Sequence, residues 1–278
     1  MPTCPGFNSN VSITFIGTAT AILEVDNVRF LTDPFFSPAG SYYDMPGRNA
    51  RLTVRQDPAL ALKELPPIDA VLLSHEDHWD NLDQLGRHLL DGRHVFTTMD
   101  GAKQLAPRPG VVGMQPWQEK TVVLGGKTFR ITATPADHVP GDECTGFILT
   151  TDSFGVSRDG RPNALYFSGD TVYMEEHPQM ADKFHIAAAI LNTGDARAQL
   201  EPPPAPLRQI TLGGKEAADM FRAIKADYIV PMHFDAWDHF TQHQDGLAEA
   251  FEQEGVSDKV IWLNPGKPVK ILCDGFQK

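Results

Sequence analysis

The chain has 278 residues, of which 41% are hydrophobic and 22% charged, as in an ordinary globular protein that can bury a substantial core. Its formal net charge of -12 and the lack of any run of lysine and arginine argue against nucleic acid as a partner, because a phosphate backbone needs a basic surface. No apolar run is long enough to span a membrane, and no basic segment followed by an apolar one opens the chain, so we expect no membrane partner and no signal peptide.

The three cysteines are far apart in the chain and form no CxxC pair; they are Cys4, Cys144 and Cys273. They therefore predict neither a disulfide framework nor a cysteine-rich zinc site. A reducing, cytoplasmic setting is the expected one, and no feature of the sequence indicates the oligomeric state.

The first part of the chain predicts a β-meander. Apolar residues have the spacing of strands at residues 11–16, 21–25 and 28–31. Residues 35–56 are rich in Gly, Pro, Ser and Tyr and predict a long loop, which in a compact domain usually forms a lid or a wall of a functional site. A short helix is expected at residues 58–65, because Asp57 can cap it and Pro58 suits its first position.

The rest of the chain mixes strands with a few helices. Strand and hairpin patterns occur at residues 68–73, 95–98, 111–129, 131–134, 146–151, 164–167, 187–191, 228–230, 260–263 and 269–272. Helical patterns occur at residues 82–90, 214–225 and 247–254. No shift in composition marks a linker, so we expect one domain spanning residues 1–278, of the α/β class, with two sheets sandwiched between helices.

One pattern recurs where the predicted strands end. Four times an apolar strand is followed at once by a histidine or an aspartate, namely His75, His138, Asp170 and His233. Residues just past strand ends gather along one edge of a sheet, where rigid strands carry variable loops. Imidazole and carboxylate together are the ligand set of Zn²⁺, Mn²⁺ and Fe²⁺ sites. Each residue alone is more often a surface or capping residue, but four in order make coincidence improbable.

The order and the residues of these segments resemble those of the metallo-β-lactamase superfamily, especially its branch of small hydrolases similar to ascorbate-6-phosphate lactonase. The matching segments are residues 13–20, 31–34, 68–75, 134–138, 167–171 and 229–233. They resemble, in that order, the family's first strands, its Asp-Pro turn, the strand before its HxHxDH signature, its third-histidine motif, the segment of its metal-bridging aspartate and its final-histidine strand. The resemblance implies an αββα sandwich of two mixed sheets flanked by helices.

The HxHxDH signature is the least regular part of the resemblance, because this chain has SHEDHWDN from residue 74. Counted from the strand, His75 is the family's first histidine and Asp77 falls on its second. Counted back from the Asn-Leu-Asp that follows, His78 is the second histidine and Asp80 the aspartate, while Asn81 replaces the third histidine. A third register keeps the adjacent Asp-His pair and puts a leucine at the first histidine.

We favour one inserted residue in this loop, so that both histidines and the later aspartate reach the metals. The resemblance then implies a first metal held by His75, His78, His138 and Asp170. A second metal would be held by Asp80, Asp170 and His233. This second set lacks the usual histidine, because the amide oxygen of Asn81 is a poor zinc ligand. The second position would then be weak, would suit a harder ion such as Mn²⁺, or would bind no metal.

The resemblance also implies an activity, the hydrolysis of a small-molecule substrate by a metal-activated water. The bond that is hydrolysed could be a cyclic ester or lactone, an amide or a phosphodiester. Zn²⁺ is the expected ion, one or two per chain, with Mn²⁺ or Fe²⁺ as alternatives. Asp80 would take the proton of the reacting water, and Asp77 is the alternative for that role. The competing hypothesis is a non-hydrolytic metal-binding protein or an iron redox protein on the same fold, which the replaced histidine leaves open.

Several other residues could line such a site, although packing or a solvated surface is the commoner role for each. Tyr173 could donate a hydrogen bond to an oxyanion, and His239 and His243 have the i,i+4 spacing of a helical metal site. The remaining candidates are Tyr42, Tyr43, Arg48, His177, His185, Trp237 and Phe240.

Overall fold

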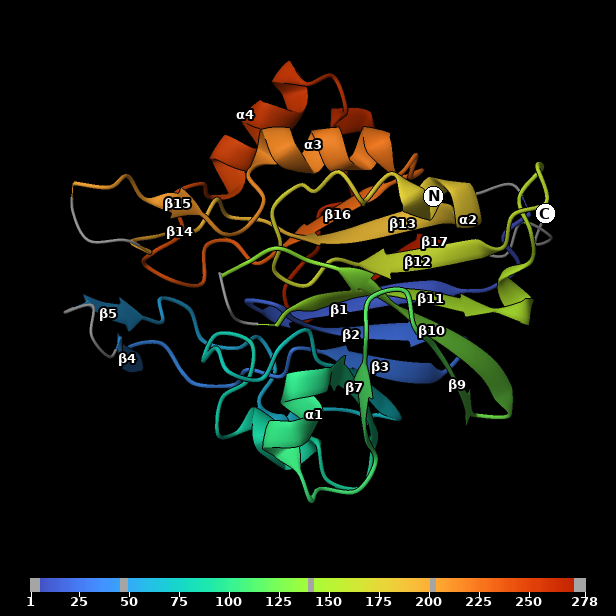
Figure 1. The fold of residues 1–278 in the computed structure, drawn as a ribbon, viewed down its shortest axis with the longest axis horizontal. Coiled ribbons are helices and arrows are strands. Elements are labelled where there is room, and N and C mark those ends of the chain that lie inside the picture. Colours follow the sequence, from blue (N-terminus) through green and yellow to red (C-terminus); the bar gives the residue numbers. More distant parts are fainter. Residues whose placement is uncertain (1–5, 46–49, 140–142, 201–203, 273–278) are drawn as a thin grey trace.

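Two β-sheets packed face to face form the centre of the molecule in a computed structural model, which describes residues 6–45, 50–139, 143–200 and 204–272 (Figure 1). Two of the cysteines, Cys4 and Cys273, and the candidate Arg48 lie outside the described residues. The first sheet has the strand order β17 (Pro268–Leu272), β1 (Val11–Gly17), β2 (Thr20–Val25), β3 (Val28–Thr32), β6 (Ala70–Leu72), β7 (His94–Thr98) and β8 (Val111–Met114). The second has the order β16 (Ile229–Met232), β13 (His185–Asn192), β12 (Asn163–Phe167), β11 (Thr145–Thr151), β10 (Lys127–Pro135) and β9 (Glu119–Leu124).

Both sheets are mixed. The pairs β3–β6, β6–β7 and β7–β8 are parallel in the first sheet, as are β12–β13 and β13–β16 in the second, and the other pairs are antiparallel. The parallel strands β6, β12, β13 and β16 are buried along almost their whole length, which explains why their sequences are almost continuously apolar.

The core between the sheets is aromatic and aliphatic. Phe30 of β3 and Phe129 of β10 meet there edge to face, with ring centroids 5.1 Å apart, and neither side chain is exposed. On the outside, α3 (Gly214–Ala223) and α4 (Gln244–Gln253) cover the second sheet, and α1 (Met99–Leu105) lies against the first (Figure 1). The short α2 (Gln179–Lys183) precedes β13. The predicted α/β sandwich of two mixed sheets flanked by helices is confirmed.

One predicted strand is wrong. Residues 260–263 form no strand and make a single bridge, between Val260 and Ile229. Their continuous apolar run has another cause, because Ile261 packs on the core between the sheets while Trp262 packs on the layer under the outer helices. The pattern therefore reflects burial on two sides of an extended segment rather than pairing in a ladder.

Two predicted helices are much shorter than expected. Residues 58–65 contain only a 3-10 turn at Leu62–Glu64, and residues 82–90 only one at Gly86–Leu89. The second is held close to the first sheet, since a Cβ on Gly86 would lie 1.7 Å from the carbonyl oxygen of Pro34. Only a glycine fits at this position, because any side chain would meet the backbone that follows β3.

The region predicted as a long loop contains a hairpin, formed by β4 (Tyr42–Met45) and β5 (Ala50–Thr53). A second small hairpin pairs β14 (Arg197–Ala198) with β15 (Arg208–Gln209), and both lie at the same end of the sandwich (Figure 1). The sequence pattern also missed α1, whose first turn is capped by the Thr98 hydroxyl, 2.9 Å from the Gly101 amide. Within the residues described, no helix is long and apolar enough to cross a membrane.

Candidate metal centre

The four residues that follow strand ends meet at one edge of the sandwich. His75 comes just after β6, His138 after β10, Asp170 after β12 and His233 directly after β16. Each side chain is buried, with at most 5% of the residue exposed. Strands from both sheets thus deliver polar groups to a common point, as the recurring sequence pattern predicted.

Three histidines form the first group, here called the histidine cluster (His75, His78 and His138). One ring nitrogen of each lies within 4.8 Å of those of the other two. The closest pair is His138 Nε2 and His78 Nδ1, at 3.0 Å. The loop between His75 and His78 therefore brings both imidazoles to the same point.

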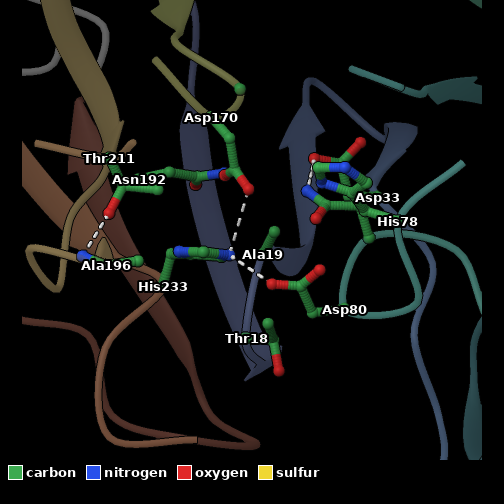
Figure 2. Close-up of polar contacts among 12 residues, drawn as sticks. Thr18, Ala19, Asp33, His78, Asp80, Asp170, Asn192, Ala196, Thr211 and His233 are labelled. Carbon is green, nitrogen blue, oxygen red and sulfur yellow. Dashed lines mark hydrogen bonds and ion pairs between the residues drawn. The ribbon is translucent and has the colours of Figure 1, made fainter. Parts of the chain in front are cut away.

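A second group, here called the acidic cluster, consists of Asp80, Asp170 and His233. The Nε2 atom of His233 lies between the two carboxylates, 3.5 Å from Asp80 Oδ2 and 3.4 Å from Asp170 Oδ2 (Figure 2). Asp170 Oδ2 is also 3.9 Å from His138 Nε2 in the histidine cluster. One carboxylate oxygen thus faces both clusters.

The outward nitrogens of three of these imidazoles are fixed by the protein. His138 Nδ1 donates to the carbonyl of Ile210 over 2.6 Å, and His233 Nδ1 lies 3.3 Å from the carbonyl of Thr193. His75 Nδ1 is 2.8 Å from the Ser74 hydroxyl. Because a carbonyl can only accept, the bonds to the first two rings leave Nε2 free to face the clusters, which is the arrangement of metal-ligating histidines.

Several of the inward-facing atoms make no hydrogen bond. Among the described residues, His75 Nε2, Asp170 Oδ2 and His233 Nε2 are buried and make no hydrogen bond. Asp170 Oδ2 and His233 Nε2 face each other only at ion-pair distance, 3.4 Å, and such buried polar atoms without hydrogen bonds are the ones that could serve as ligands of a cation. Imidazole nitrogens and carboxylate oxygens fit a divalent transition metal such as Zn²⁺, Mn²⁺ or Fe²⁺.

The protonation states differ between the clusters. Burial, with the neighbouring histidines, holds the pKa of His75 well below its usual value, and burial also lowers the pKa of His138. Burial acts to lower the pKa of His233 as well, but Asp170 and Asp80 outweigh it and raise that pKa to about 9. Conversely, burial opposes ionisation of Asp80, yet contact with His233 holds its pKa below the ordinary range.

A cavity of about 480 Å³ opens onto both clusters. Its wall is largely apolar and aromatic, with Leu52, Trp79, Leu207 and Trp237 among the lining residues. Leu52 belongs to β5, so the region predicted to form a wall does contribute one.

The other residues that the sequence suggested for the site lie partly along the cavity and partly elsewhere. Asp77 lines the cavity but belongs to neither cluster. His239 and Trp237 line it too, and Phe240 packs on the His233 ring with centroids 4.8 Å apart. Tyr43 stacks on Trp79 at 5.4 Å. Four candidates have contacts of other kinds: Tyr42 under Arg51, Tyr173 against the buried His177, His185 near Asp227, and His243 with Asp235.

Some residues around the site were missed in the sequence. The buried Asp33 accepts hydrogen bonds from the Ser74 amide at 2.6 Å, the Ser74 hydroxyl at 2.7 Å and the Asn81 amide group at 3.0 Å. Asn192, at the end of β13, donates to Asp170 Oδ1 at 2.7 Å (Figure 2). Both follow apolar strands, so the rule that found the clusters could have found them as well.

Comparison with known proteins places most of the chain in one family. The model of the beta-lactamase superfamily domain matches residues 28–234, which contain the four residues at the strand ends. The UPF0173 protein YddR of Bacillus subtilis is 24% identical over 267 residues, which are 92% of this chain and 98% of that protein. A UPF0173 metal-dependent hydrolase of Methanopyrus kandleri is 24% identical over 258 residues, 92% of this chain and 97% of that one.

A solved structure shares the fold over nearly its whole length. The isothiocyanate hydrolase from Delia radicum gut bacteria superposes with a TM-score of 0.75 at 20% identity, covering 93% of this chain and 98% of that one.

Proposed function

This chain belongs to the beta-lactamase superfamily, and we propose that it hydrolyses a small carbonyl compound such as a lactone, an ester or an amide. It is a metal-dependent hydrolase, as relatives that match it along almost their whole length are named. The bond, the metal and the roles of the residues below are our proposal.

One observation supports the metal site above all others. Asp170 Oδ2 is buried, has no hydrogen-bond partner among the described residues, and faces His138 Nε2 at 3.9 Å and His233 Nε2 at 3.4 Å. A carboxylate in this position can bridge two ions or anchor one. The ligands would be His75, His78, His138, Asp80, Asp170 and His233.

A divalent ion held by these residues would supply a water of near-neutral pKa and would polarise the substrate's carbonyl oxygen. The protein's own groups orient the reacting water. Asp80 lines the cavity beside His233 and would be placed to accept a hydrogen bond from that water and guide its proton away. Asp77 lines the same cavity and is the second carboxylate available to carry the proton to the leaving group.

The cavity favours a neutral, apolar substrate. Trp79, Leu207 and Trp237 supply a hydrophobic wall. The lining cation Arg197 lies 3.1 Å from Asp195, so its charge is already compensated. Apart from Arg197, the described lining offers no arginine or lysine to bind a phosphodiester outside the metal ligands, so the apolar wall favours a carbonyl compound. The isothiocyanate named for the structural neighbour is likewise a small electrophile.

Metal analysis followed by a substrate panel tests this proposal. The purified protein is stripped with a chelator, reloaded separately with Zn²⁺, Mn²⁺ or Fe²⁺, and assayed on aliphatic lactones, aryl esters, anilides, isothiocyanates and an aryl phosphodiester. We expect metal-dependent turnover of the carbonyl compounds. Turnover of the phosphodiester alone would overturn the choice of bond. Iron with dioxygen-dependent turnover would favour the redox alternative, and failure to bind any metal would overturn the proposal.

A further inference from the structure

The acidic cluster has two carboxylates but only one imidazole. The position next to Asp80, where the resemblance implies a histidine, is Asn81. Its side chain is fully buried and donates from Nδ2 to Asp33 Oδ2 over 3.0 Å. Asn81 therefore supports Asp33 with its amino group, and its remaining atom is an amide oxygen, which suits hard ions better than zinc.

A second imidazole approaches the acidic cluster from another part of the chain. His239 lies in the segment between β16 and α4, and its Nε2 is 3.9 Å from Asp80 Oδ2. His233 Nε2 contacts the same carboxylate oxygen at 3.5 Å. The His239 side chain is only 16% exposed, although it lines the cavity. Two imidazoles thus converge on one carboxylate oxygen.

The segment that carries His239 is anchored on both sides of this residue. Before it, Trp237 is fully buried and donates from Nε1 to the Thr18 hydroxyl over 3.2 Å. After it, Phe240 forms a β-bridge with Ala196 and packs against the His239 ring, with centroids 4.6 Å apart. A solvated histidine on a surface helix has no such supports, so the geometry points to a defined role for this ring.

We propose that His239 is a ligand of the second metal position and supplies the imidazole that Asn81 does not. The inference rests on the proposed metal-dependent function. It supplies the second imidazole that the expected set of Asp80, Asp170 and His233 lacks, and it predicts two ions per chain. With two imidazoles and two carboxylates, the position suits Zn²⁺ or Co²⁺ at least as well as Mn²⁺.

Metal stoichiometry of matched variants provides the test. Wild type, His239→Ala and His243→Ala are stripped, titrated with Zn²⁺ against a competing chelator, and analysed for bound metal. His243 is the control, because it lies in the same segment, is exposed and pairs with Asp235 at 2.8 Å. We expect two ions in wild type and in His243→Ala. In His239→Ala we expect one tight ion and a second bound at least 10–100-fold more weakly, the loss typical of even an outer partner of a ligand.

Visible spectra of the Co²⁺ forms give a readout that does not depend on activity. Loss of one imidazole should change the absorption of the second Co²⁺ equivalent and leave that of the first unchanged. Far-ultraviolet circular dichroism of the stripped variants checks that both are folded.

The outcomes separate this inference from the broader proposal. Two tight ions with an unchanged spectrum in His239→Ala would overturn the assignment of His239 and leave the metal-dependent function in place. A single ion in wild type would do the same. Wild type without bound metal would overturn both.

Discussion

Asp33 and His75 are connected through one hydroxyl group. The Ser74 hydroxyl donates to Asp33 Oδ2 over 2.7 Å and lies 2.8 Å from His75 Nδ1. With its proton given to the carboxylate, the hydroxyl can only accept from His75 Nδ1–H, which leaves His75 Nε2 unprotonated toward the histidine cluster. Burial raises the pKa of Asp33 to about 7 even though three donors from Ser74 and Asn81 oppose the shift.

Replacing this carboxylate should weaken the first metal position without removing a ligand. In Asp33→Asn the amide can accept one of the Ser74 bonds, but its NH₂ group meets donors from Ser74 or Asn81 and leaves buried groups unsatisfied. We expect about 10–100-fold weaker Zn²⁺ binding and a loss of roughly 1–3 kcal/mol in the free energy of unfolding. Competition titration and denaturant unfolding measure the two effects.

The control for this variant is Asp69→Asn. Asp69 also accepts a backbone bond, from the Arg29 amide at 2.8 Å, but takes no part in the clusters. Equal metal affinity in both variants would contradict a positioning role for Asp33.

The stability of the metal-free protein should fall in mildly alkaline solution because of His233. The folded-state pKa of this group, about 9, lies above its ordinary value of 6.5. Its contribution is therefore fully present below pH 6.5 and is lost as the pH rises through 9. A shift of this size corresponds to about 3 kcal/mol. Urea unfolding of the chelator-treated proteins measures this effect. Between pH 6.5 and pH 9, the free energy of unfolding of wild type should fall by about 3 kcal/mol more than that of His233→Gln. Equal pH dependence of the two proteins would contradict the raised pKa of His233.

Metal binding at the acidic cluster should release a proton. His233 must be neutral to act as a ligand, whereas its raised pKa keeps it protonated in the metal-free protein at pH 7.5. The pKa values of His75 and His138 are lowered, so the histidine cluster is largely ready for an ion. Calorimetric titrations in buffers of different ionisation enthalpy should show about one proton released with the acidic-cluster ion. Its loss in His233→Gln is expected, and equal release by both proteins would contradict the assignment.

The fold was predictable where burial and pairing coincide. The apolar strands at 164–167 and 187–191 pair in parallel inside the second sheet, so their sequence pattern and their structure agree. Residues 260–263 form a similar continuous apolar run but lie against two layers without a ladder, which no pattern in one sequence can distinguish. The close packing of Gly86 on Pro34 depends on a contact distant in sequence, so it was equally hidden.

The site was predictable only in part, because some of its residues are positioned by contacts between segments that are distant in the sequence. His75, His138 and His233 each follow a strand, and the order of strands fixes where their side chains go. His239 follows no strand end, and its position comes from the anchoring of Trp237 and Phe240 on other segments. The solvated surface that the sequence favoured for both histidines holds for His243, which is exposed and pairs with Asp235, but not for His239, which lines the cavity.

The apolar cavity wall should control substrate affinity separately from the chemistry. Leu207 lines the cavity and is 52% exposed, so a charge there disturbs neither the core nor the clusters. Leu207→Asp removes a hydrophobic contact worth roughly 1–2 kcal/mol to an apolar substituent and adds charge beside it. We expect KM for an apolar ester or lactone to rise about tenfold, equivalent to about 1.4 kcal/mol, with kcat changed less than twofold, because no metal ligand is touched.

The matched control is Val123→Asp on β9, which is 64% exposed and is not among the residues that line the cavity. An unchanged KM across substrates of increasing chain length would show that the apolar part of the substrate binds elsewhere, whereas a fall in kcat alone would place Leu207 next to the reacting bond.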